Sequence, residues 1–64
     1  MIITDVIIDY INQSNKTNRI TKMFVDLDEN NMTDSFIMNS LPDNIKNDIK
    51  ILTNIELKNT ELIL

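Results

Sequence analysis

No cross-link can reinforce this chain, because its 64 residues include neither cysteine nor histidine. A chain of this length buries only about 60% of the surface that it exposes when unfolded, so its core is thin. Disulfides and zinc sites built from thiolate or imidazole ligands are both excluded. We therefore predict one small domain over residues 1–64, stabilised by apolar packing and by contacts with a second copy or a partner.

The missing residue types also exclude several classes of function. The chain has no glycine, so it holds no glycine-rich loop for phosphate groups or dinucleotides. Catalytic triads that use histidine are excluded as well. Ten acidic residues against six basic ones give a net charge of −4, which disfavours binding to nucleic acid. We predict that the protein is not an enzyme, binds no cofactor and acts through another protein.

Two features of the sequence bear on where the protein works. Asp5 and Asp9 interrupt the apolar run 2–11, so we predict an intracellular, cytoplasmic protein with neither a secretory signal nor a membrane span. Isoleucine and asparagine, which have AT-rich codons, supply 22 of the 64 residues, whereas alanine and glycine, which have GC-rich codons, supply none. This bias indicates an AT-rich genome, and small acidic proteins of such genomes are often phage, plasmid or viral accessory and counter-defence products.

The apolar residues near the start recur at spacings of three and four, the period of one face of a helix. They are Ile3, Val6, Ile7, Tyr10 and Ile11. Thr4 fits the N-cap position, and Asp5 suits the positive end of the helix dipole. The sequence therefore predicts a helix over residues 4–14.

The middle of the chain alternates apolar and polar residues, which favours a β-hairpin. One strand runs over residues 20–27 and the other over 32–38, with asparagine providing the left-handed backbone of the turn at 28–31. The expected cross-strand pairs are Leu27–Met32, Met23–Phe36 and Val25–Asp34. Because Ile20, Phe24 and Leu27 also fit a helical spacing, an all-α fold with four short helices is the alternative.

The last third of the chain predicts a long helix over residues 41–56. Pro42 suits a first helical turn, and Ser40 with Asp43 resembles a capping box. An apolar stripe follows at helical spacing: Leu41, Ile45, Ile49, Leu52 and Ile55. Residues 51–57 also alternate, which leaves a strand open as the alternative there. The predicted fold class is α+β, a helix, a hairpin and a helix, with both helices on one face of the two strands.

One acidic segment carries a pattern of possible metal ligands. Acidic and amide side chains stand at positions one, three, five and nine of a twelve-residue stretch, and these are Asp26, Asp28, Asn30 and Asp34. The stretch resembles the calcium loop of EF-hand proteins, and the resemblance implies a calcium-responsive module with a helix on each side. The stretch departs from the family where Asn31 replaces the turn glycine and Ile37 the bidentate glutamate. We assign no metal ligands and interpret the segment as an acidic surface turn.

The leading prediction is a non-enzymatic protein-binding module that inhibits or regulates another protein. Its acidity suits a target with a basic surface, since opposite charge steers association while apolar anchors hold the complex. The predicted contacts are the acidic turn and the apolar C-terminal residues, which are Asp26, Asp28, Glu29, Asp34, Leu62, Ile63 and Leu64. The alternatives are the calcium module and a structural homo-oligomer that pairs the apolar faces of residues 3–11 and 41–55.

Overall fold

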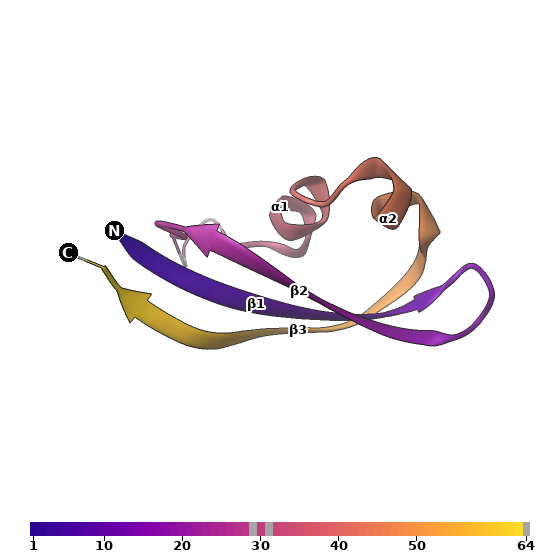
Figure 1. Cartoon of the computed structure of the whole chain (residues 1–64). Coiled ribbons are helices and arrows are strands. Elements are labelled where there is room, and N and C mark those ends of the chain that lie inside the picture. Colours follow the sequence, from indigo (N-terminus) through magenta and orange to yellow (C-terminus); the bar gives the residue numbers. More distant parts are fainter. Residues whose placement is uncertain (29, 31, 64) are drawn as a thin grey trace.

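The chain folds into a three-stranded antiparallel sheet with two short helices on one face (Figure 1). The computed structural model describes residues 1–28, 30 and 32–63. In chain order the elements are β1 (Ile2–Asn12), β2 (Thr17–Val25), α1 (Asp34–Asn39), α2 (Asp43–Asp48) and β3 (Ile49–Leu62). β1 lies in the centre of the sheet, between β2 and β3. The molecule is elongated, with extents of 42, 18 and 18 Å.

The predicted helix over residues 4–14 is wrong, because this segment is the central strand β1. Seven of the eleven residues of β1 are Ile, Val or Thr, whose branched Cβ favours extended backbone. Its apolar residues lie on both faces of the sheet, with Val6, Ile8 and Tyr10 under the helices and Ile3, Ile7 and Ile11 on the opposite face. Two apolar faces in alternation reproduce the spacings of three and four that indicate a helix.

The predicted hairpin pairs the wrong segments. A strand does cover most of residues 20–27, but it is β2, and its partner is β1 rather than residues 32–38. Met23 lies opposite Asp5, and Val25 lies opposite Ile3. None of the three expected pairs forms, because the segment predicted as the second strand contains helix α1.

Asparagine side chains and backbone shape the loop that joins β1 to β2. The Asn12 Oδ1 atom accepts hydrogen bonds from the N–H groups of Ser14 and Lys16, both at 3.0 Å. Asn15 has a φ of 62°, in the left-handed region that glycine usually occupies. Asparagine therefore replaces glycine in the β1–β2 hairpin, at Asn15, whereas part of the turn predicted at 28–31 lies outside the described residues.

Helix α1 begins where a threonine satisfies the backbone. The Thr33 hydroxyl accepts a hydrogen bond from the Phe36 N–H at 3.1 Å, which is the usual N-cap contact. At the other end, the Ser40 N–H donates to the carbonyl oxygens of Phe36 and Ile37. The Ser40 hydroxyl donates to the Ile37 carbonyl oxygen at 2.6 Å. Ser40 thus ends α1, and the predicted capping box with Asp43 does not form.

Helix α2 is much shorter than the predicted helix over residues 41–56. It begins after Pro42, as the sequence indicates, but it ends at Asp48. The strand that the alternation of residues 51–57 left open is β3, which follows α2 directly. The α+β order of helix, hairpin and helix is therefore wrong, and so is the all-α alternative.

Three bulges shape β3. Its register against β1 shifts at Lys50, Thr53 and Asn59, which have no opposite residue on β1. Each extra residue brings the next apolar side chain back to the helix-covered face. The residues on that face are Ile49, Leu52, Ile55, Leu57, Thr60 and Leu62. Because bulges produce spacings of three, the pattern mimics a helix from Ile49 onward, which explains the wrong prediction.

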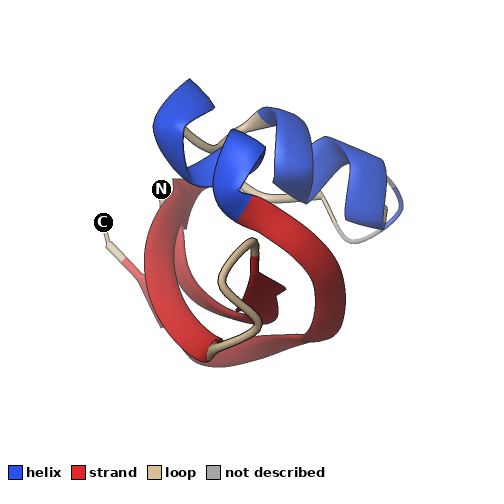
Figure 2. Cartoon of the chain, turned by 90° about the vertical axis from the view of Figure 1, so that its right-hand side faces the viewer, coloured by secondary structure: helices blue, strands red, loops and turns tan. Residues whose placement is uncertain are grey.

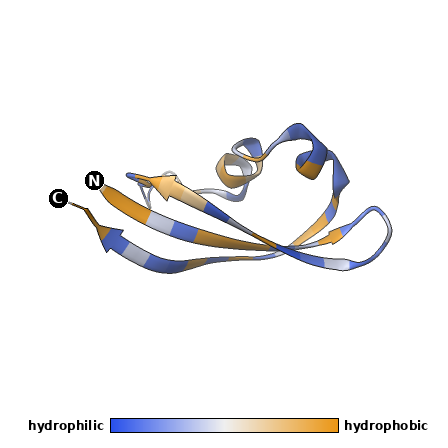
Figure 3. Ribbon diagram, viewed as in Figure 1, coloured by the Kyte–Doolittle hydropathy of each residue, from blue (hydrophilic) through white to orange (hydrophobic). Residues whose placement is uncertain are grey.

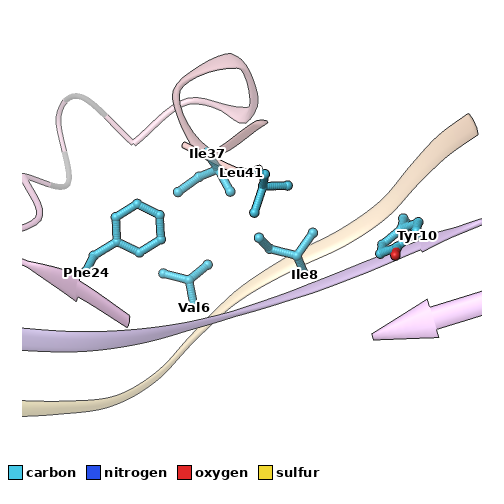
Figure 4. Close-up of a cluster of buried hydrophobic side chains, with 6 residues drawn as sticks. All are labelled: Val6, Ile8, Tyr10, Phe24, Ile37 and Leu41. Carbon is cyan, nitrogen blue, oxygen red and sulfur yellow. The ribbon is translucent and has the colours of Figure 1, made fainter. Parts of the chain in front are cut away.

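The core lies between the sheet and the helices (Figure 4). Its buried side chains are Val6, Ile8, Tyr10, Phe24, Ile37 and Leu41. Val6 and Ile8 of β1 and Ile37 of α1 have 0% exposure. Seen along the molecule, both helices lie on one side of the curved sheet, and the other side carries no helix among the described residues (Figure 2). The core is therefore one layer deep and depends on few side chains.

Candidate functional site

The structure brings Asp26 of the predicted acidic turn to the same end of the sheet as the predicted apolar contacts Leu62 and Ile63. Ile2 lies opposite Leu62, and the backbones of Met1 and Ile63 exchange hydrogen bonds of 2.9 and 2.7 Å. On the other side of β1, the Asp26 N–H donates to the Ile2 carbonyl oxygen at 2.7 Å. The Asp26 carboxylate in turn accepts a hydrogen bond from the Ile2 N–H at 2.9 Å. Asp26 and Leu62 are far apart in the sequence, but only β1 separates them.

Four apolar side chains at this end are exposed to solvent. We call them the terminal surface: Met1, Ile2, Leu62 and Ile63. Their exposed fractions are 61%, 42%, 62% and 42% in that order. The ribbon has the colour of hydrophobic residues near both ends of the chain (Figure 3). The apolar C-terminal residues are predicted to pack on something, and the described part of the chain does not cover Leu62 or Ile63. Ile2 and Leu62 share the helix-covered face, whereas Met1 and Ile63, one position further along, lie on the opposite face, so the apolar side chains surround this end of the sheet. Exposed apolar side chains gathered in one place are typical of a surface that another molecule covers.

One of the predicted acidic contacts, Asp26, lies beside the terminal surface, and Asp28 follows it two residues later in the chain. Asp26 has a φ of 52° and extends the β1–β2 pairing through its two hydrogen bonds to Ile2. Its carboxylate therefore has a structural role, which the sequence does not indicate. The Asp28 carboxylate accepts a hydrogen bond from the Asn30 N–H at 2.9 Å. Both aspartates are exposed, so their charge remains at the surface.

The third described acidic contact lies elsewhere. Asp34 stands in the first turn of α1, where the helix dipole favours a carboxylate. It lines a shallow cavity of about 210 Å³ together with residues 52–55 of β3. Ile55 lies opposite Ile8, six positions along β1 from Ile2, which is roughly 20 Å from the terminal surface. The predicted contacts Glu29 and Leu64 lie outside the described residues.

Charge is divided unevenly between the two layers of the molecule. Residues 26–48, which connect β2 to β3 and carry both helices, contain six acidic residues and one lysine, a net charge of −5. The rest of the chain contains four acidic and five basic residues, a net charge of +1. The protein therefore presents an acidic helical layer on a nearly neutral sheet. We call residues 26–48 the acidic layer.

Sequence reasoning missed half of the terminal surface. Met1 and Ile2 belong to it because β1 pairs with the end of β3, and the predicted helix over residues 4–14 hides this pairing. The available signal was the unbroken apolar start of the chain together with its equally apolar end. Two apolar strand ends at opposite ends of a sequence are candidates for antiparallel pairing.

An ion pair crosses the uncovered face of the sheet. Arg19 of β2 lies opposite Asp9 of β1, and its Nε atom is 2.7 Å from one carboxylate oxygen, with a second hydrogen bond of 3.1 Å to the other. The hydrogen bond from Arg19 holds the pKa of Asp9 below its ordinary value of 3.8. Asp9 in turn raises the pKa of Arg19.

This ion pair makes the free energy of unfolding depend on pH in the acidic range. Because the pKa of Asp9 is lower in the folded chain than in the unfolded one, its contribution is present above pH 3.8 and lost as the pH falls through the lowered pKa. We expect Asp9→Asn to be less stable than the natural chain at neutral pH and equally stable well below pH 3.8. Urea denaturation at both pH values measures the difference. In Arg19→Gln the same difference should be much smaller, because only the weaker hydrogen bond from Asn54 then lowers the pKa of Asp9. A pH-independent gap would contradict the assignment.

The segment that resembles a calcium loop lacks the flanking helix that the resemblance implies. Strand β2 ends at Val25, directly before Asp26, and α1 begins at Asp34 within the stretch. Among the described residues, no three acidic side chains gather where they could hold a metal ion. Neither helix of the described chain has the length and apolar character needed to cross a membrane.

Comparison with models of known protein families finds no match, and comparisons with curated proteins and with solved structures find none either.

Proposed function

We propose that this chain is a non-enzymatic protein-binding module that inhibits or regulates a partner with a basic surface. The observation that carries the proposal is the terminal surface, four exposed apolar side chains with Asp26 hydrogen-bonded to the backbone of one of these residues, Ile2, and exposed Asp28 two residues further along the chain. The cytoplasmic location expected from the sequence is part of the same proposal.

The two halves of the site act at different stages of binding. The acidic layer, with a net charge of −5, attracts a basic partner over about one Debye length, roughly 8–10 Å at physiological salt. Once the partner is in contact, Leu62 and Ile63 lose their water and act as anchors. Charge therefore governs the association rate, and the apolar anchors govern the dissociation rate.

Substitution of the anchors tests the proposal. We expect the natural chain, immobilised and exposed to lysate from an AT-rich bacterial host, to retain a basic protein that quantitative mass spectrometry identifies. The double variant Leu62→Ser with Ile63→Ser should retain at least about tenfold less of that protein, since central apolar anchors dominate binding energy. Ile51→Ser is the matched control, because Ile51 is 52% exposed but lies far from the terminal surface on β3.

A second pair of substitutions tests the charge. Asp28→Asn with Asp34→Asn removes two charges and keeps an oxygen at each position for hydrogen bonding. With the protein identified above, we expect a slower association rate, a smaller effect of salt and an unchanged dissociation rate. If the serine variants and the control retained the same proteins in equal amounts, the proposal would be overturned.

A further inference from the structure

The two edges of the sheet differ in how well they could accept another strand. β3 forms one edge, and its three bulges break the regular row of backbone groups, which is a common protection of an edge. β2 forms the other edge (Figure 1), and the register of its nine residues against β1 has no shift. The outer edge of β2 is therefore regular along its whole length.

The register shows which backbone groups of β2 point outward. At the two ends of the pairing, the Asn12 N–H donates to the Lys16 carbonyl oxygen and the Asp26 N–H donates to the Ile2 carbonyl oxygen. Hydrogen-bonded and non-hydrogen-bonded pairs alternate between antiparallel strands. The even-numbered residues of β2 therefore bond to β1. The outward residues are Thr17, Arg19, Thr21, Met23 and Val25, and all five are exposed.

We propose that this edge pairs antiparallel with the β2 edge of a second copy, about a two-fold axis at Thr21, to form a continuous six-stranded sheet. The register is self-complementary: Arg19 faces Met23 of the second copy, and Thr17 faces Val25 of the second copy. On the helix-covered face, Lys22 lies beside Ile20 of the second copy. No like charges stand opposite each other, although β2 contains two basic residues.

A groove runs alongside this edge on the helix-covered face. It has a volume of about 370 Å³ and is lined by Ile20, Thr21, Lys22, Leu41, Pro42 and Ile45. The proposed register places Ile20 of the second copy beside Lys22, so its side chain enters this mainly apolar groove. Lys22 of the second copy then lies under the acidic layer, whose net charge of −5 attracts it. The groove and the charge therefore both fit a second copy.

This inference stands apart from the proposed function, because the terminal surface and β2 share no residue. Both can be occupied at once. The dimer would present two terminal surfaces, one on each copy, and thus bind a partner with two basic sites more tightly than one copy could.

Charge substitutions at Met23 test the register. Met23 is 60% exposed, so its replacement leaves the core intact. Met23→Lys places a lysine opposite Arg19 of the second copy. Because of the two-fold symmetry, this repulsive pair occurs twice in the dimer. Met23→Glu places a carboxylate there instead and creates two attractive pairs. Sedimentation equilibrium of the full chain over the micromolar range measures the dimer dissociation constant. We expect about tenfold weaker dimerisation for Met23→Lys and equal or tighter dimerisation for Met23→Glu.

The opposite effects of the two Met23 variants on dimerisation distinguish edge pairing from nonspecific apolar association. Loss of an exposed methionine from a nonspecific apolar contact would weaken association in both variants alike. Within one chain, Met23 lies opposite Asp5, so the lysine favours the fold and the glutamate disfavours it, the reverse of the expected effect on dimerisation. Ile51→Lys on β3 is the control and should leave the dissociation constant unchanged. A natural chain that stays monomeric throughout the range, or equal weakening by both Met23 variants, would overturn the inference.

Discussion

Replacing Ile8 by alanine is expected to remove about half of the free energy of unfolding. Ile8 has 0% exposure in the middle of β1 and lies opposite Ile20 of β2 and Ile55 of β3. Truncation of a buried isoleucine removes its contacts and leaves a cavity, which costs about 2–5 kcal/mol. A chain of 64 residues has only about 3–10 kcal/mol of total stability. The loss therefore takes away a large part of the free energy of unfolding.

Urea denaturation followed by circular dichroism measures this effect. We expect the midpoint of unfolding of Ile8→Ala to fall to half of its natural value or lower. Ile51→Ala removes the same atoms from a side chain that is 52% exposed on the uncovered face, so we expect a change of about 0.5 kcal/mol or less. Similar losses in the two variants would contradict the placement of the core.

The local features that the sequence predicted correctly are those that a few neighbouring residues decide. The alternation near residues 20–25 does form a strand, and a helix does begin after Pro42. Each depends on the backbone preferences of adjacent residues. Neither of them says which strand pairs with which.

Strand partners were not predictable from those local signals. Residues 4–11 have apolar side chains on both faces, because β1 is the central strand and its uncovered face is still shielded by its neighbours, as the 6% exposure of Ile7 shows. An alternating pattern needs one polar face, and this strand lacks it. The density of β-branched residues was the signal that remained.

The candidate site was predictable in its parts but not in its assembly. The sequence indicates an acidic turn and an apolar tail as separate contacts, and the register of β1 with β2 and β3 joins Asp26 to Leu62. The same register places Asp34 elsewhere and assigns the Asp26 carboxylate to the Ile2 N–H. Such long-range pairings depend on the whole sheet, and no pattern within a short segment indicates them.

Single-residue deletions should have opposite outcomes in β1 and β3, which tests the bulges directly. Deleting Ile7 forces one half of β1 to shift by a position. Either Asp5 then takes the place of Val6, or Asp9 takes the place of Ile8, and both places have 0% exposure. Because a buried unpaired carboxylate costs several kcal/mol, we expect this variant not to fold. Ile7→Ala, which keeps the register, is the control and should still unfold cooperatively.

Deleting Thr53 should have a small effect, because Thr53 is the extra residue of a bulge and has no opposite residue on β1. The shortened strand spaces Leu52 and Ile55 by two positions, so both side chains stay on the helix-covered face without a bulge. We expect a cooperative transition and a loss of about 1 kcal/mol, measured by urea denaturation beside the Ile7 deletion. If both deletions abolished folding, the bulge would be needed for the curvature of the sheet. If both were tolerated, the register of β1 would not be fixed by the core.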